Sequence, residues 1–276
     1  MSMKRTDQAA AWLPTDFGEM LNRVVASKSV AAQASTPFST DKQKVGFPLF
    51  VANPAVGWYN ELDEITPADG DTDEVVITPS KTAGLTLLSN ELADDSDPAI
   101  ADQIGSALAD QIAKAIDVAY FANATSKSYS GLLSKSYTTV DAGGPTLANL
   151  DKFVSARYAA EAHGARLTHW LVDPTVAEAI SLLKKLSSGS NESLLQFVED
   201  KVLIVGLPVI TTTDVDSGTL AWGVDKSQQR LVTRKGTTVE RFPSVTNDGQ
   251  WVRAISRIGW DTLNPAGIVR IWDATP

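Results

Sequence analysis

Two strand-like apolar segments flank a strongly acidic stretch in the first third of the chain. The segments FPLFVANPAVGWY (47–59) and VVITPSKTAGLTLLS (75–89) are rich in Val, Leu, Phe and Thr, residues found often in strands. Between them, residues 61–74 contain seven carboxylates and no basic residue, and Pro67 and Gly70 favour a turn. The pattern therefore predicts a hairpin of roughly 15 residues per arm with an acidic tip.

A hairpin of this length needs a surface to lie on, because an isolated two-stranded hairpin is only marginally stable in water. Its tip is too highly charged to be buried in a core. If no later segment of the chain covers the strands, a neighbouring subunit must supply the surface. We therefore expect residues 47–80 to contact another copy of the chain more than their own.

The apolar positions that follow recur every four residues and predict a long helix from about residue 97 to about residue 122. Asp97 is a good N-cap, and Pro98 suits the first helical position. At about 1.5 Å per residue, this helix would extend about 39 Å and could brace an elongated domain. The repeating positions are Ile100, Ile104, Leu108, Ile112, Ile116 and Tyr120.

The first 36 residues have the pattern of an arm. Pro14 and Thr15 can begin a short helix, and the segment SKSVAAQAST (27–36) that follows it is polar and extended in character. Two interpretations remain open: an arm that contacts a neighbour through a small apolar face, or a helix packed in its own domain. The apolar positions at helical spacing are Phe17, Met20, Leu21, Val24 and Val25.

From residue 146 onward, helical and strand patterns alternate before the chain ends in long strands. We expect helices over 146–163 and 175–186. Strands early, helices in the middle and strands again at the end favour an α+β fold in which the two ends of the chain meet. The expected strands are 167–172, 201–212, 219–224, 229–235, 237–242 and 249–272.

Composition and charge narrow the class of protein. With 276 residues, 43% of them hydrophobic, the chain can bury a large core, whereas its net charge of −9 argues against a nucleic-acid-binding surface. It has no apolar run long enough to span a membrane and no signal-peptide core. The absence of cysteine excludes disulfides, thiolate metal sites and cysteine nucleophiles. Stability must therefore come from packing within the chain or from other copies of it.

Motifs for catalysis or cofactor binding are missing from the sequence. It has no phosphate-binding glycine loop, nucleophile elbow or HExxH motif, and its two histidines, His163 and His169, are too few for a metal site. The segment DGDTDE (69–74) alternates possible calcium ligands but lacks the distal Glu of a calcium loop. A carbohydrate-active enzyme that uses paired carboxylates is a distant alternative. We expect a structural protein that is not an enzyme and that has no metal and no cofactor.

The order of these features resembles the major capsid protein of tailed bacteriophages, whose Hong Kong-type capsid fold is shared with encapsulin shells. Residues 47–95 look like the extended E-loop that leads into the spine helix of that family, and ANATSKSYSGLL (122–133) resembles the segment after the helix. LVDPTVAEAISLLKKL (171–186) resembles the apical helix after its strand. VLIVGLPVITTTDV (202–215) resembles a strand pair, and WVRAISRIGWDTLNPAGIVRI (251–271) resembles the closing strands.

The resemblance implies a division of the chain and a function. The chain would be a major capsid protein that assembles in the host bacterial cytoplasm into hexamers and pentamers of an icosahedral virion. It would enclose double-stranded DNA without binding it specifically, and it would bind no membrane. Scaffolding, portal and decoration proteins are further possible partners, and an encapsulin-like compartment shell is the alternative function. The expected parts are an N-terminal arm (1–36), the E-loop hairpin with its roots (37–89), the spine helix of a peripheral domain (90–127), an axial domain (128–240) and closing strands of the peripheral domain (241–276).

In that family the E-loop and the arm contact neighbouring subunits, so the resemblance implies two sets of contact residues. Arg241, Arg253 and Arg257 are candidate ion-pair partners for the acidic tip. The expected hairpin contacts are Trp58, Glu61, Asp63, Glu64, Asp69, Asp71, Asp73 and Glu74, and the expected arm contacts are Phe17, Met20, Leu21 and Val24.

Some members of the family cross-link their shells covalently through an isopeptide bond between an E-loop Lys and an Asn of another subunit. Here the hairpin tip has no Lys, since Lys44 and Lys81 lie at its roots, and the matching late position falls near Asn247 and Asp248. We therefore expect a shell without covalent cross-links.

Overall fold

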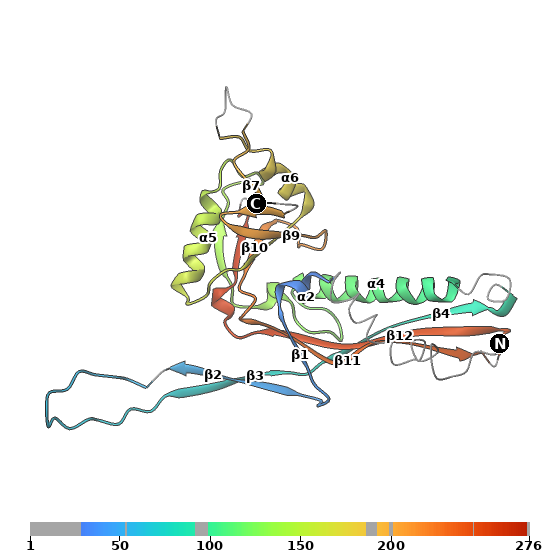
Figure 1. The fold of residues 1–276 in the computed structure, drawn as a ribbon, viewed down its shortest axis with the longest axis horizontal. Helices are drawn as coiled ribbons and strands as arrows, with labels where there is room; N and C mark the ends of the chain where they lie inside the picture. The colour runs from blue at the N-terminus through green and yellow to red at the C-terminus, as the bar shows by residue number, and fades with distance from the viewer. Residues whose placement is uncertain are drawn as a thin grey trace, which may run out of the picture.

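The computed structural model describes residues 29–52, 54–91, 99–185, 192–198, 201–244 and 246–274. Figure 1 shows a four-stranded sheet with a long helix along it, a second sheet with its own helices, and a two-stranded hairpin that projects away from both. The mixture of helices and strands agrees with the predicted fold class. None of the helices among the described residues is long and apolar enough to cross a membrane.

The four-stranded sheet has the strand order β1–β11–β12–β4. The three strands β11 (Gln229–Pro243), β12 (Gly249–Thr262) and β4 (Ser80–Ser89) are antiparallel neighbours. The short β1 (Thr36–Ser39) pairs with β11 in parallel. The sheet therefore joins segments from the start, the first third and the end of the chain.

The long helix predicted from its four-residue repeat is α4 (Ala99–Phe121), and it lies along one face of the four-stranded sheet (Figure 1). Asp97 and Pro98, the expected start of the helix, lie outside the described residues. From Leu108 to Tyr120 the repeat faces the sheet, because residues four apart lie on one side of a helix. The core between helix and sheet includes Ala109, Ile112, Ile116, Tyr120, Ala254, Ile258 and Trp260.

The second sheet has seven strands in the order β5–β13–β10–β6–β9–β8–β7. Helices α5 (Asp151–Ala162) and α6 (Pro174–Ser181) share a buried core with it. In this core Phe153 and Trp170 meet edge to face with ring centroids 4.9 Å apart. The strands are β5 (Thr138–Asp141), β13 (Val269–Trp272), β10 (Thr219–Val224), β6 (His169–Val172), β9 (Leu207–Thr211), β8 (Lys201–Ile204) and β7 (Gln196–Val198).

Strand pairing shifts the boundaries expected from the sequence. The segment 128–240 contains most of β11, which belongs to the four-stranded sheet, and the segment 241–276 contains β13, which belongs to the seven-stranded sheet. β11 also joins the segments 229–235 and 237–242, which were expected as two strands, through a pairing irregularity at Lys235. Local periodicity predicts that a strand exists, but its partners are long-range contacts.

The helices after residue 146 are shorter than predicted. The helix expected over 146–163 begins at Asp151, and the one expected over 175–186 ends at Ser181. Two single turns of 3₁₀-helix, Leu132–Ser134 and Pro265–Gly267, complete the regular structure of the described chain.

One buried carboxylate anchors the first described residues to α4. Ser29 caps the short helix α2 (Val30–Ala34). Asp117 of α4 accepts hydrogen bonds from Ser29 Oγ at 2.7 Å and from the amides of the next two residues at 3.0 Å each. Helix α2 is part of the core around α4, so residues 29–36 of the expected arm belong to the body of the subunit.

Burial raises the pKa of Asp117, and the three hydrogen bonds that it accepts oppose this rise. The negative charge of Asp214 adds to the rise. The folded state therefore holds this proton more tightly than the unfolded state. The contribution of the group to stability is greatest below the ordinary pKa of an aspartate and is lost as the pH rises through the raised pKa.

We predict that Asp117→Ala lowers the free energy of unfolding of the unassembled subunit by about 1–3 kcal/mol, because it leaves buried donors at the start of α2 without an acceptor. The difference from the wild type should widen as the pH falls from 7 toward 4, since only the wild type gains stability from the raised pKa. Urea unfolding at several pH values measures both effects.

The matched control is Asp69→Ala in the exposed hairpin tip, which should change stability by less than about 0.5 kcal/mol. A difference between Asp117→Ala and wild type that shrinks with falling pH would contradict the assigned direction of the pKa shift.

Candidate assembly surfaces

The projecting hairpin consists of the antiparallel strands β2 (Val45–Ala52) and β3 (Asp71–Ile77). The paired part is shorter than the sequence predicts. Of the residues between the strands, 54–70 form no strand, and residues 80–89 leave the hairpin to join the four-stranded sheet as β4. In Figure 1 the hairpin extends far from both sheets.

The hairpin tip, residues 54–74, is exposed at every position. Large apolar side chains project from it: Val56 is 96% exposed, Trp58 105% and Leu62 101%. The same segment carries seven carboxylates and no basic side chain. An exposed surface that is both apolar and charged is typical of an interaction site. Every hairpin residue singled out from the sequence lies in it: Trp58, Glu61, Asp63, Glu64, Asp69, Asp71, Asp73 and Glu74.

The base of the hairpin, in contrast, is packed against the body. Phe47 of β2 meets Phe38 of β1 edge to face with ring centroids 5.5 Å apart, and the guanidinium of Arg230 lies 5.8 Å from the Phe47 centroid. Ile77 of β3 is fully buried. A β-carbon at Gly259 of β12 would lie 2.9 Å from Ile77 Cγ2, so glycine is needed for this close approach.

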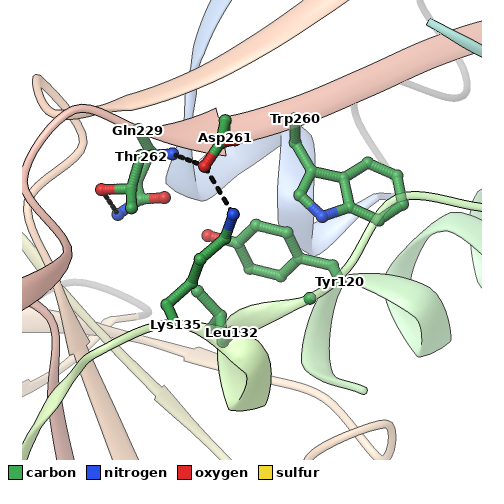
Figure 2. A pocket seen from close by; sticks show the side chains of 8 residues that line it. Tyr120, Leu132, Lys135, Gln229, Trp260, Asp261 and Thr262 are labelled. Carbon is green, nitrogen blue, oxygen red and sulfur yellow. Dashed lines mark hydrogen bonds and ion pairs between the residues drawn. The ribbon is translucent and has the colours of Figure 1, made fainter. Parts of the chain in front are cut away.

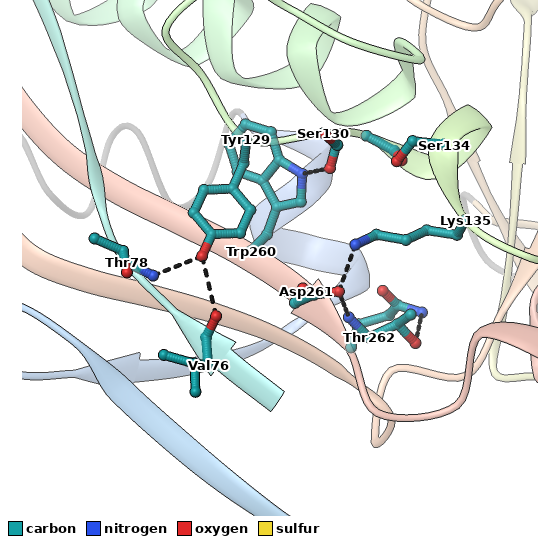
Figure 3. A network of polar contacts seen from close by, with 11 residues as sticks. Val76, Thr78, Tyr129, Ser130, Ser134, Lys135, Trp260, Asp261 and Thr262 are labelled. Carbon is teal, nitrogen blue, oxygen red and sulfur yellow. Dashed lines mark hydrogen bonds and ion pairs between the residues drawn. The ribbon is translucent and has the colours of Figure 1, made fainter. Parts of the chain in front are cut away.

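Tyr129, from the loop after α4, forms hydrogen bonds with the base of the hairpin (Figure 3). Its hydroxyl accepts a hydrogen bond from the Thr78 amide at 2.6 Å and donates one to the Val76 carbonyl at 3.3 Å. Its ring packs against Trp260 with centroids 6.1 Å apart, and Trp260 Nε1 donates to the Ser130 carbonyl at 3.2 Å. Burial raises the pKa of Tyr129, so its hydroxyl keeps the proton that it donates.

The face of the four-stranded sheet that points away from α4 is partly exposed. Residues paired directly across neighbouring strands share a face, and the register places Arg253 opposite both Leu85 and Glu240. Leu85 is 57% exposed and Leu87 is 39% exposed. We call this surface the open face. Its residues are Lys81, Ala83, Leu85 and Leu87 of β4, Trp251, Arg253, Ile255 and Arg257 of β12, and Lys235, Thr238, Glu240 and Phe242 of β11.

The structure separates the three candidate arginines. Arg253 and Arg257 lie on the open face, whereas Arg241 is paired with the buried Val252 and lies on the side of α4. Arg253 forms an ion pair with Glu240 and donates a hydrogen bond to its carboxylate. This bond lowers the pKa of Glu240. The Arg257 side chain has no ion-pair or hydrogen-bond partner among the described residues.

Two hollows in the described part of the chain lie beside α4. A cavity of about 10 Å³ at the end of α4 has room for one water molecule (Figure 2). A groove of about 390 Å³ lies between α4 and the loop 211–214. Neither lining contains a histidine, and within the described ranges no group of three or more His, Cys, Asp or Glu could hold a metal ion. The small cavity is lined by Tyr120, Gly131, Leu132, Lys135, Gln229, Trp260, Asp261 and Thr262.

The remaining residues singled out from the sequence are the candidate cross-link positions and the arm contacts. Lys81 is on the open face beside the hairpin base, and Asn247 is in the turn between β11 and β12, at the far end of the same sheet. Lys44 is exposed just before β2. The expected arm contacts lie outside the described residues: Phe17, Met20, Leu21 and Val24.

Sequence reasoning missed the residues that hold the hairpin base. Tyr129 lies in a Ser-rich loop, and Gly259 lies within a strand pattern. An isolated glycine in a strand can indicate a close approach of another segment, so Gly259 was a signal that could have pointed to this place. No comparable signal marks Tyr129.

Comparisons with known proteins agree with this architecture. The model of one family, described as the phage capsid family, matches residues 9–272. Among solved structures, the capsid of an empty GTA particle, computed with C5 symmetry, has a TM-score of 0.75 at 18% identity, with 90% of each chain covered. A structure from Microbacterium phage Oxtober96 has a TM-score of 0.75 at 14% identity and covers 89% of this chain and 91% of its own. One from Mycobacterium phage Adephagia has 0.73 at 13% identity with both chains fully covered.

At these identities the structural matches show a shared fold. No curated protein matches the sequence.

We predict that Trp58→Ala changes the free energy of unfolding of the unassembled subunit by less than about 0.5 kcal/mol, because the ring is fully exposed. Trp170→Ala, which removes a fully buried ring, should cost about 3–5 kcal/mol. Urea unfolding of both variants tests whether the hairpin packs on its own subunit. A loss above about 1 kcal/mol for Trp58→Ala would show that it does.

Proposed function

The chain belongs to the phage capsid family as a major capsid protein of the virion, and from this premise we propose how its subunits join. The family is structural, so the carbohydrate-active enzyme considered from the sequence is set aside. We propose that the tip of each hairpin lies on the open face of a neighbouring subunit. The observation that carries this proposal is the complementarity of two exposed surfaces on one chain.

Charge supports this pairing. The hairpin tip has seven acidic and no basic residues. The open face has four basic residues, Lys81, Lys235, Arg253 and Arg257, and one acidic residue, Glu240. Opposite charges guide association and suppress wrong pairings more than they add affinity.

Apolar burial supplies most of the affinity in this proposal. Exposed ion pairs contribute about 0–1 kcal/mol each, whereas a large apolar side chain contributes about 1.5–3 kcal/mol when it is fully buried. Both surfaces expose such side chains: Val56, Trp58 and Leu62 on the tip, and Leu85 and Leu87 on the open face. A contact of this kind repeats at every interface of a closed symmetric shell.

In family terms, the hairpin is assigned as the E-loop and α4 as the spine helix. The four-stranded sheet with α4 is assigned as the peripheral domain, and the seven-stranded sheet with α5 and α6 as the axial domain. The expected arm shortens to residues 1–28, because residues 29–36 are packed in the body. We propose that the arm contacts a neighbour through Phe17, Met20, Leu21 and Val24.

The assembled particle follows from the same premise. We propose that the subunits form hexamers and pentamers of an icosahedral head that encloses double-stranded DNA. The net charge of −9 supports a wall that does not bind the DNA tightly. Two similar structures are capsids of GTA particles computed with C5 symmetry, in keeping with five-fold vertices.

Charge reversal on the open face tests the proposed contact. We predict that Arg257→Glu reduces the yield of closed particles at least about tenfold, because it places a like charge opposite the acidic tip. The variant subunit should keep its thermal stability, since Arg257 has no bonding partner in the described part of its own chain. Sedimentation velocity and electron microscopy measure the yield.

The matched control is Lys184→Glu, an exposed lysine beside the seven-stranded sheet. It makes the same change in charge and should leave the particle yield unchanged. Normal closure of the Arg257→Glu variant would contradict the proposed contact.

A second prediction concerns cross-links. Mature particles boiled in detergent should run as one band near 29.5 kDa, because the hairpin tip has no lysine and the chain has no cysteine. A ladder of larger bands that survives a reducing agent would show that a covalent bond joins the subunits.

A further inference from the structure

We propose that the Tyr129 hydroxyl fixes the direction in which the hairpin leaves the body, and that this direction allows neighbouring subunits to close into a shell. Tyr129 would thus be a positioning residue that never touches the neighbour itself. The second half of the proposal rests on the function proposed above.

Tyr129 acts where the strand ladder is interrupted. β3 ends at Ile77 and β4 begins at Ser80, so the chain passes from the hairpin to the four-stranded sheet through Thr78 and Pro79 without strand pairing. Proline has no amide to donate. At this junction the Tyr129 hydroxyl bonds to both sides of Ile77, through the carbonyl of the residue before it and the amide of the residue after it.

The two kinds of contact at the hairpin base have different effects. The apolar contacts of Phe47 and Ile77 keep the base attached, but apolar contacts are not directional. Hydrogen bonds weaken steeply when their angles change. A hydroxyl that donates on one side of Ile77 and accepts on the other therefore restrains the rotation of the hairpin about its base.

Tyr129 can act as a reference point because its own position is fixed by the body. Its ring packs against Trp260 of β12, whose Nε1 bonds to the next residue of the loop, Ser130 (Figure 3). Gly131 follows Ser130. A β-carbon at Gly131 would lie 2.3 Å from the Ala122 carbonyl oxygen, so the loop lies in close contact with the end of α4. The hairpin is thereby oriented relative to α4 and β12 together.

The length of the hairpin amplifies any error at its base. At about 3.3 Å per residue, Leu62 in the tip can lie up to about 50 Å from Thr78, and a rotation of about 10° would then move it by about 9 Å. Side chains in contact approach within about 4–4.5 Å. A loosely directed tip would therefore miss a neighbour's surface much of the time.

The first experiment measures the direction in the unassembled subunit. The chain has no cysteine, so Thr72→Cys on the exposed part of β3 and Val118→Cys on α4 carry two spin labels without other changes. Pulsed electron resonance gives the distribution of the distance between them. We expect a narrow distribution in the parent, one at least twice as broad with Tyr129→Phe, and no change with the control Tyr158→Phe. Tyr158 is 64% exposed on α5.

The second experiment measures assembly of the same tyrosine variants without labels. Tyr129→Phe keeps the ring on Trp260 and should leave the subunit folded, as its circular dichroism will show. We expect at least about a fivefold loss of closed particles for Tyr129→Phe and none for Tyr158→Phe. An unchanged distance distribution overturns the positioning role, and a broadened distribution with normal closure overturns its importance for the shell. If the wild-type chain forms no particles at all, the proposed function fails, while the distance measurement still decides the role of Tyr129.

Discussion

No described residue of the same subunit buries the hairpin tip, which is exposed at every position from 54 to 74. Trp58 and Leu62 are fully exposed among carboxylates, and the strands behind them leave the body in a direction that carries them away from both sheets (Figure 1). Apolar area of this kind is removed from water only by another molecule. In the proposed symmetric assembly every copy would both donate a hairpin and receive one, so the exposed tip of one subunit would form the contact with the next.

The projecting hairpin can hold a fixed direction only if the body that carries it is rigid. Contacts between the two sheets help to make this body rigid. Leu171, Trp222 and Val224 of the seven-stranded sheet are buried in the same cluster as α4 and the four-stranded sheet. At the edge of this cluster, Asp216 accepts hydrogen bonds from Trp222 Nε1 at 2.9 Å and from Arg270 at 2.7 Å. Residues of both sheets therefore share this cluster, while α5 and α6 pack in a second cluster, and Ile77 at the hairpin base packs against Gly259 of β12.

Sequence patterns predicted the parts of the subunit better than their connections. The repeat through Ile112 and Ile116 gave the long helix, and the segment 219–224 gave a strand with its predicted bounds. The paired part of the hairpin is shorter than predicted because β4 pairs with β12, more than 150 residues later in the chain. No local sequence pattern shows this pairing. Tyr129 was missed for the same reason, because its role depends on hydrogen bonds to the Val76 carbonyl and the Thr78 amide, and only the fold brings these groups to it.

A cryo-electron microscopy map of the assembled particle would show whether a neighbouring subunit buries the hairpin tip. We expect the density for residues 54–74 to lie across β4 and β12 of an adjacent subunit, with the Trp58 ring buried near Leu85 and Leu87. A map in which the tip folds over its own α4, or projects into solvent with Trp58 exposed, would rule out this contact.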